Sequence, residues 1–223
     1  MVTVAVVGLD GAGKTTITHR LVDRLPFETA YLYMGMNPAS SNVALPTTRL
    51  AHAHRHRVSG ETSRHDVSTR RRQRGTVWST LRLVNRVTEE VVRHLIARLH
   101  HLRGRVVVTD RDFFIDYAAA AKEPIGLLDR IHLWFLGSVL PKPDLVVWLD
   151  AAPAVLYARK PEVPVSYLER RRDRIAALRP VFRRFEVVDA ERSEDDVYRT
   201  VERLVIGACT QRGIARRSDG AAR

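Results

Sequence analysis

Residues 2–16 read VTVAVVGLDGAGKTT, and this stretch decides the fold. Gly8 to Thr15 fits the spacing G-x-x-x-x-G-K-[ST], and the apolar run Val4 to Val7 before it is typical of a buried parallel strand. The glycines allow a tight turn whose N–H groups can approach phosphate oxygens. A helix expected over Lys14 to Leu25 directs its positive dipole end at the same place. The stretch therefore predicts an anion site in an α/β domain.

Two side chains of this loop have the chemistry that a nucleoside triphosphate needs. Lys14 would reach the β- and γ-phosphates as a point charge, and the Thr15 hydroxyl would hold Mg²⁺. The alternative is a glycine-rich turn without a ligand, but strand, spacing, lysine and threonine coincide here. We therefore expect a bound nucleoside triphosphate with its magnesium ion.

Length and composition indicate one globular domain, which we assign to residues 1–210. The chain has 223 residues, 45% of them hydrophobic and 28% charged, enough for one sizeable core. Cys209 is its only cysteine and cannot form an internal disulfide. No signal-peptide pattern opens the sequence, so a cytoplasmic protein is expected. The apolar segment 131–140 is too short to span a bilayer.

The basic charge of the chain does not by itself indicate nucleic-acid binding. The net charge is +12 and the pI about 10.7. Of the 37 basic residues 33 are arginine, a bias that a GC-rich genome produces through codon usage. No zinc-finger, helix-turn-helix or RNP-type pattern accompanies the charge. A polyanionic small molecule such as a nucleotide is a sufficient partner.

Residues 37–76 have the composition of a basic, mobile insertion. They show no apolar periodicity and carry eight arginines against Glu61 and Asp66, which is half of the net charge. A loop this long is usually functional or disordered. The sequence leaves both a lid that meets an anionic substrate and a solvated loop open. Residues 211–223 are expected to form a disordered tail.

The remaining segments alternate between apolar strands and amphipathic helices, as in an α/β sheet. Strands are expected at 29–34, 105–110, 144–150 and 186–189, and helices at 78–102, at 115–140 with a break near Pro124, at 166–185 with an interruption at Pro180, and at 193–207. Asp110 and Arg111 emerge at the carboxyl end of a strand, where open α/β sheets bind their ligands.

Five motifs follow one another: GLDGAGKTT, the pair Asp110-Arg111, PDLVVWLD at 143–150, an Arg/Lys-bearing segment after it, and Val188-Asp189-Ala190. Their order resembles that in thymidylate kinase and its relatives among the P-loop nucleoside monophosphate kinases. The resemblance covers most of the chain apart from residues 37–76 and the tail. It implies a three-layer P-loop fold whose five-stranded parallel sheet has the order 2-3-1-4-5 and is flanked by helices.

The resemblance also implies roles for matching residues. ATP would be held by Gly8, Asp10, Gly11, Ala12, Gly13, Lys14, Thr15, Thr16 and Lys160, with Asp189 and Ala190 beside the adenine. Asp110 would act with Thr15 on the Mg²⁺ shell, although Asp150 also ends a strand and competes for this role. The acceptor would meet Asp10, Arg82, Arg86 and Arg111, but a surface arginine at position 86 needs no such explanation.

Transfer also needs a cation for the migrating phosphoryl group. The family supplies this cation from the P-loop or from the lid, and here Ala12 stands where the first arrangement has an arginine. Arg159, Lys160 or one of Arg170, Arg171 and Arg172 is therefore expected to supply it.

The sequence as a whole favours an ATP- and Mg²⁺-dependent kinase of a nucleoside monophosphate or a related phosphorylated metabolite. A kinase of a hydroxyl group on a nucleoside, sugar or antibiotic, and a nucleic-acid-binding nucleotide hydrolase, are the alternatives. We expect dTMP to be a poor substrate. Thymidylate kinases usually carry an Arg-Glu-Pro-Gly-Gly-like segment where residues 34–38 read MGMNP, and a phenylalanine where Arg82 stands. The oligomeric state stays open, a homodimer included.

Overall fold

A computed structural model describes residues 1–35, 76–121 and 124–214. The expected insertion, residues 37–76, lies outside these residues except for Thr76, which begins a helix. The tail from residue 215 onward also lies outside them. The fold is therefore described for the three ranges.

Five parallel strands form the sheet, and their order 2-3-1-4-5 confirms the prediction. β1 (Thr3–Gly8) is central and pairs with β3 (Val106–Asp110) and β4 (Leu145–Asp150). β2 (Thr29–Tyr33) and β5 (Phe185–Asp189) form the edges. The central strands are almost wholly buried, because helices cover both faces of the sheet.

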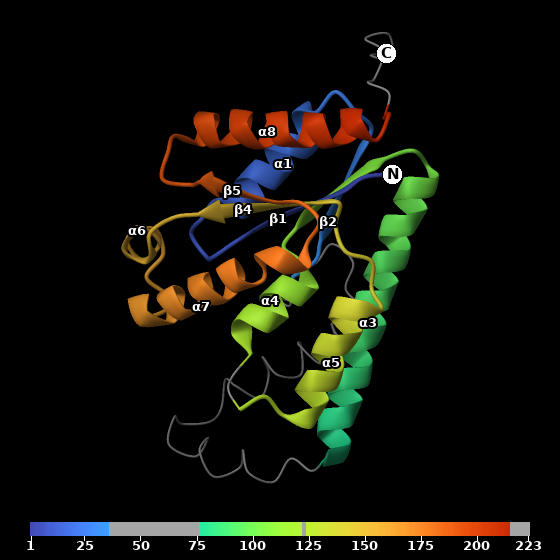
Figure 1. The fold of residues 1–223 in the computed structure, drawn as a ribbon, viewed down its shortest axis with the longest axis vertical. Coiled ribbons are helices and arrows are strands. Elements are labelled where there is room, and N and C mark those ends of the chain that lie inside the picture. The colour runs from blue at the N-terminus through green and yellow to red at the C-terminus, as the bar shows by residue number, and fades with distance from the viewer. Residues whose placement is uncertain (36–75, 122–123, 215–223) are drawn as a thin grey trace, which may run out of the picture.

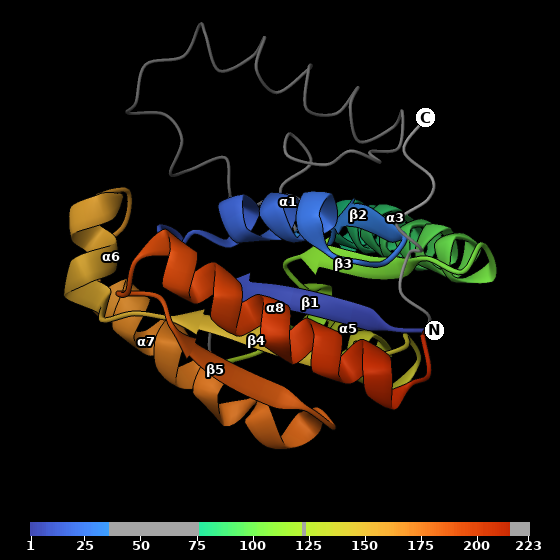
Figure 2. The same cartoon turned by 90° about the horizontal axis from the view of Figure 1, so that it is seen from above.

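Helices lie on both faces of this sheet (Figure 1). α1 (Lys14–Arg24) and α8 (Glu194–Gln211) lie side by side across one face, as the view from above shows (Figure 2). α4 (Phe113–Ala120), α5 (Leu127–Ser138) and α7 (Val165–Ala177) lie on the other side, where the long α3 (Thr76–Leu102) packs against α5, β2 and β3. The short α6 (Pro153–Arg159) was not expected from the sequence.

The helix ends that differ most from those expected are the ends of α7 and α8. The helix assigned to residues 166–185 ends at Ala177, and Pro180 lies in a separate 3₁₀ turn, Arg179–Val181, since proline lacks the N–H that a helix needs. Phe185 begins β5 instead, where its ring packs edge-on against Trp148. The last helix runs on past Gly207 to Gln211.

On α3, charged side chains are buried and several large apolar side chains are exposed, the opposite of what an amphipathic helix usually shows. Glu90 and Arg93 are almost completely buried on its inner face because they find polar partners there. Five apolar side chains, each more than half exposed, share one outer face: Leu81, Val84, Leu95, Leu99 and Leu102. We call these five residues the outer stripe. None of the helices in the described ranges has the length and hydropathy to cross a membrane.

Candidate functional site

The turn between β1 and α1 has the geometry of a phosphate-binding loop. Gly13 caps α1 with φ of 80°, a left-handed conformation that favours glycine. A Cβ on Gly8 would lie 2.6 Å from the carbonyl oxygen of Leu149 in β4. These two positions therefore need glycine, and the N–H groups that open α1 face outward from the carboxyl edge of the sheet.

Lys14 is held inside this loop. Its side chain is 5% exposed, and Nζ donates a hydrogen bond to the carbonyl oxygen of Leu9 at 2.6 Å and lies 3.8 Å from Oδ1 of Asp10. Burial, together with the nearby charge of Arg111, lowers the pKa of Lys14 to about 8. A buried ammonium group beside the start of α1 is suited to receive an anionic ligand.

Thr15 and Asp110 are brought together as a pair. The Thr15 hydroxyl donates to Oδ2 of Asp110 at 2.7 Å, and Asp110 is 1% exposed. The other carboxylate oxygen, Oδ1, is buried and has no hydrogen-bond partner in the described part of the chain. Hydroxyl and carboxylate oxygens are the ligands that Mg²⁺ prefers, so these residues fit a magnesium ion.

Asp150, the competing acid, has a different partner. Its two carboxylate oxygens accept from Nε and the Nη2 group of Arg172 at 2.7 and 2.6 Å. This bidentate pair joins the end of β4 to α7. Among these two acids, it is Asp110 that lies beside Thr15.

Arg111 takes a strained backbone conformation at the end of β3. Its φ is 75°, and no other non-glycine residue of the described chain has a positive φ. Its backbone N–H donates to Val6 at 2.9 Å, and Nη2 donates to Oδ1 of Asp10 at 2.6 Å. Strain of this kind concentrates at functional sites, and here it directs the guanidinium toward the P-loop.

A second acid, Asp116, and an arginine of α7, Arg171, complete this charged cluster. Asp116 on α4 lies 3.5 Å from Nη1 of Arg111 and 3.7 Å from Nη2 of Arg171. Burial raises the pKa of Asp116, although both arginines oppose the rise. For Asp10 the charges of Lys14 and Arg111 outweigh burial, so its pKa lies below the ordinary value. Sequence reasoning missed Asp116, whose signal is an acid within the apolar run FFIDYAAA.

The sequence also did not indicate the roles of Gly35 and Arg93. Gly35 leaves room for the Arg111 side chain, and Arg93 binds the end of β2 next to it. A Cβ on Gly35 would lie 2.4 Å from Cδ of Arg111, so only glycine leaves room for that side chain. Arg93 is 2% exposed, and its Nη1 donates to the carbonyl oxygens of Tyr33 and Gly35, both at 3.0 Å. The end of β2 is thereby fixed beside Arg111.

The expected acceptor arginines of α3 are only partly described. Arg86 is exposed, and its guanidinium lies 5.2 Å from the ring centre of Tyr117, next to Asp116 on α4. The side chain of Arg82 lies outside the described residues. Arg86 thus lies against the helix that also carries the acid partner of Arg111.

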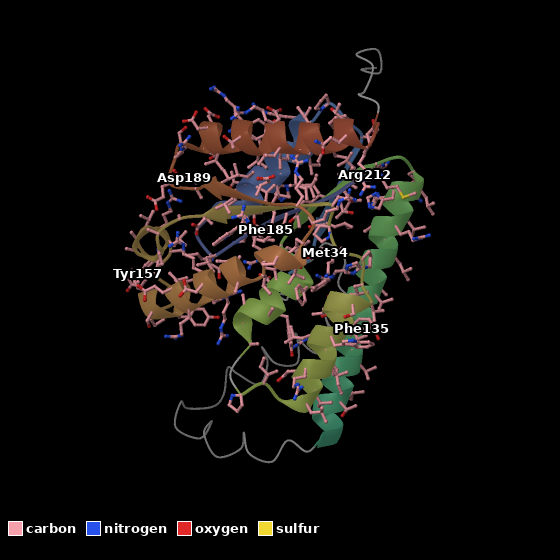
Figure 3. All side chains as sticks on the ribbon, in the orientation of Figure 1. Met34, Phe135, Tyr157, Phe185, Asp189 and Arg212 are labelled. Atoms are coloured by element: carbon pink, nitrogen blue, oxygen red, sulfur yellow. The ribbon has the colours of Figure 1, made fainter. Side chains whose placement is uncertain are left out.

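The segment after β4 reaches the P-loop from the other side. A Cβ on Gly11 would lie 3.7 Å from Cβ of Arg159 and 3.6 Å from Cβ of Lys160. Arg159 donates to the carbonyl oxygen of Ala190 at 2.9 Å, whereas Lys160 pairs with Glu162 at 3.2 Å. Figure 3 labels Asp189 at the end of β5 and Tyr157 on α6. Asp189 accepts from the backbone N–H of Glu191 at 2.9 Å, and Thr16 is exposed.

Sequence comparison reveals relatives along almost the whole chain. A thymidylate kinase of Xanthomonas oryzae is 28% identical over 219 residues, covering 94% of this chain and 85% of the relative. The thymidylate kinase of Xanthomonas euvesicatoria is equally similar over 220 residues. A probable thymidylate kinase of Staphylothermus marinus is 30% identical over 210 residues, or 89% of this chain and 92% of that protein. No family model matches the chain.

Proposed function

The chain belongs to the thymidylate kinase family, and on this premise we propose that it transfers the γ-phosphoryl group of ATP to a nucleoside monophosphate or a related phosphorylated metabolite. The observation that carries the proposal is the cluster of Lys14, Thr15, Asp110 and Arg111 at one edge of the sheet. The cytoplasm supplies ATP and is the expected compartment. We further propose that residues 1–210 form a single domain.

The donor would lie in the P-loop. Its phosphates would accept from the N–H groups at the start of α1 and replace the carbonyl of Leu9 as the partner of Lys14. Thr15 and Asp110 would hold Mg²⁺, which neutralises charge on the β- and γ-phosphates when bound. Asp189 and Ala190 would lie beside the adenine, where Arg159 already contacts the Ala190 carbonyl.

The acceptor phosphate would meet Arg111. Asp10 and Asp116 hold this guanidinium in place, and Arg86 would supply a further positive charge from α3. A phosphate acceptor is already an anion at neutral pH, so the reaction needs positioning and charge stabilisation rather than a general base.

The hydroxyl-kinase alternative would need such a base, and the charged cluster disfavours one. Asp10 is the more accessible candidate, with its side chain 34% exposed, but Lys14 and Arg111 lower its pKa against the effect of burial, which weakens it as a base. Asp110 is 1% exposed and accepts from Thr15. Both acids are therefore better suited to holding cations than to taking a proton.

We propose Arg171 as the lid cation. Three of the five expected candidates already have partners: Arg159 donates to the carbonyl oxygen of Ala190, Lys160 pairs with Glu162 and Arg172 pairs with Asp150. Arg170 is exposed, whereas Arg171 is 12% exposed and faces Asp116 within the cluster. Arg171→Ala should lower kcat on the order of 10²-fold with little change in the KM for ATP, because a contact to the migrating group is lost. Steady-state kinetics would check this. Arg172→Ala is the matched control, and an equal loss in both variants would contradict the assignment.

The acceptor can be identified by direct assay. We expect dTMP to be turned over poorly, with kcat/KM below about 10⁴ M⁻¹s⁻¹, because the MGMNP segment and Arg82 replace residues that usually hold thymidylate. The measurement is the rate of transfer from labelled ATP to a panel of nucleoside monophosphates, phosphosugars and free nucleosides. Efficient dTMP turnover would refute the expectation, and transfer only to free hydroxyls would refute the proposed function.

The outer stripe of α3 supports a homodimer. Its five apolar residues lie between Leu81 and Leu102, about 30 Å of helix, and a second copy of the same face could cover them. Val84→Glu combined with Leu99→Glu should convert a dimer to a monomer, because the charges would be buried at the interface. Light scattering of the purified chain measures this. Ala176→Glu, at an exposed position of α7, is the control. A monomeric wild type at micromolar concentration would contradict the proposed dimer.

A further inference from the structure

A cavity lies between α3 and the sheet. Its volume is about 500 Å³, within the range of small-molecule sites. Thr3 and Asp144, which lie at the amino ends of β1 and β4, line it, whereas the P-loop follows the carboxyl end of β1. Arg212, after α8, and Met34, after β2, also contribute, and Figure 3 labels both. The cavity therefore lies apart from the proposed ATP site.

The wall of this cavity is mostly apolar. Met34 and Phe113 are each 5% exposed, and Ala97, which lies on α3, is 7% exposed. Leu140 and Pro143 close the side formed by the connection from α5 to β4. Such a wall suits the aromatic or aliphatic part of a ligand, which has no polar groups to satisfy.

The basic side chains that line the cavity outnumber the acidic side chains that could neutralise them. Arg212 is compensated by Asp144, whose Oδ1 lies 2.5 Å from it. Arg98 forms no ion pair with a described residue, and Lys142 donates only a long hydrogen bond, 3.4 Å, to the carbonyl oxygen of Val181. Asp112 is the remaining acid.

The remaining titratable groups do not cancel this surplus. Oδ1 of Asp112 already accepts from the N–H of Ile115 at 3.0 Å, so this acid caps α4. Burial lowers the pKa values of His94 and His101, so both rings are neutral at neutral pH. Arg98 and Lys142 thus share the lining of the cavity with one capped carboxylate.

We propose that this cavity is a second ligand site, for a small amphipathic anion. The apolar body of the ligand would pack against Ala97 and Phe113, and its single carboxylate or phosphate group would pair with Arg98 and Lys142. The site goes beyond the proposed function, because it needs neither ATP nor the acceptor.

Binding here would also be transmitted to the reaction site. Thr109 and Asp112 line the cavity and flank Asp110 and Arg111 in the sequence. The Thr109 hydroxyl donates to the carbonyl oxygen of Arg111 at 3.0 Å. A ligand that shifts this short segment changes the affinity for substrate, and substrate changes the affinity for the ligand by the same factor.

The test uses the full chain with excess ATP and the fluorescent anion 1-anilinonaphthalene-8-sulfonate. We expect saturable binding of one probe per chain. Arg98→Glu should weaken this binding about tenfold and leave binding of the uncharged N-phenyl-1-naphthylamine unchanged, because only the charged group is lost. Arg103→Glu, directly after the C-terminal end of α3 and outside the cavity lining, is the matched control. Equal affinity in all three proteins would overturn the proposal.

A second variant tests the apolar wall. Ala97→Phe should fill the cavity and abolish binding of both probes, and thermal unfolding would verify that the variant folds. Retained binding in a folded variant would overturn the proposal. Competition then distinguishes the two head groups: displacement by naphthalene-1-acetate indicates a carboxylate site and displacement by 1-naphthyl phosphate a phosphate site. Failure of both competitors would count against the site, while phosphoryl transfer in wild type would leave the proposed function standing.

Discussion

Lys14→Ala is expected to lower kcat on the order of 10²-fold or more while the protein stays folded. Lys14 is 5% exposed, and its hydrogen bond to Leu9 joins two residues of the same loop and no other element of the fold. Its loss therefore removes charge stabilisation from the phosphoryl group without opening the core. Single-turnover transfer from labelled ATP measures the effect, and circular dichroism verifies the fold.

The same helix provides the control for this variant. Arg20 lies on α1, and its guanidinium pairs at the surface with Glu194 and Asp195 of α8. Arg20→Ala removes a cation from α1 but none from the P-loop, so kcat should stay within about twofold of wild type. Unchanged turnover in Lys14→Ala would overturn the proposed kinase mechanism.

The pH dependence of the reaction gives Lys14 a second readout. Because burial lowers the pKa of Lys14 to about 8, the free enzyme loses the ammonium charge as pH rises through 8. The value of kcat/KM for ATP should fall above this pH. At saturating ATP the bound phosphates favour the charged form, so the fall in kcat should occur at a higher pH. Coincident profiles for the two constants would show that Lys14 does not meet the triphosphate.

The sequence predicts best what is local along the chain. The P-loop needs only the order of Gly8, Gly13, Lys14 and Thr15, and the structure forms its turn from these residues. The sheet order came from the family resemblance, and it is confirmed. Apolar runs located the strands because parallel strands are buried on both faces.

The surroundings of Arg111 could not be predicted in this way. Gly35 is required by the passage of the Arg111 side chain, a contact between residues 76 positions apart. Arg93 is buried among carbonyl groups at the end of β2, so a charged residue occupies a place where helix periodicity would predict an apolar one. Such burial depends on tertiary partners, and a single sequence does not display them.

Asp110→Asn is expected to lower kcat on the order of 10²-fold and to raise the Mg²⁺ concentration needed for half-maximal rate. The amide keeps the shape of the side chain and one oxygen for the Thr15 hydroxyl. It removes the negative charge and the buried Oδ1 that has no partner in the described chain. Rates measured across a Mg²⁺ titration test this, and the Mg²⁺-dependent rise of Tm with a nonhydrolysable ATP analogue gives a readout independent of turnover.

Asp150→Asn is the matched control, because it makes the same chemical change at the carboxyl end of β4, which flanks β1 on the side opposite β3. Asp150 is held bidentately by Arg172, so its loss weakens the contact between β4 and α7. We expect stability to fall by about 1 kcal/mol, since Arg172 is 41% exposed and solvent screens the pair. The Mg²⁺ requirement should stay near that of wild type. If Asp150→Asn raised the Mg²⁺ requirement and Asp110→Asn did not, the metal would have to be assigned to Asp150, and the contact between Thr15 and Asp110 would be a structural hydrogen bond.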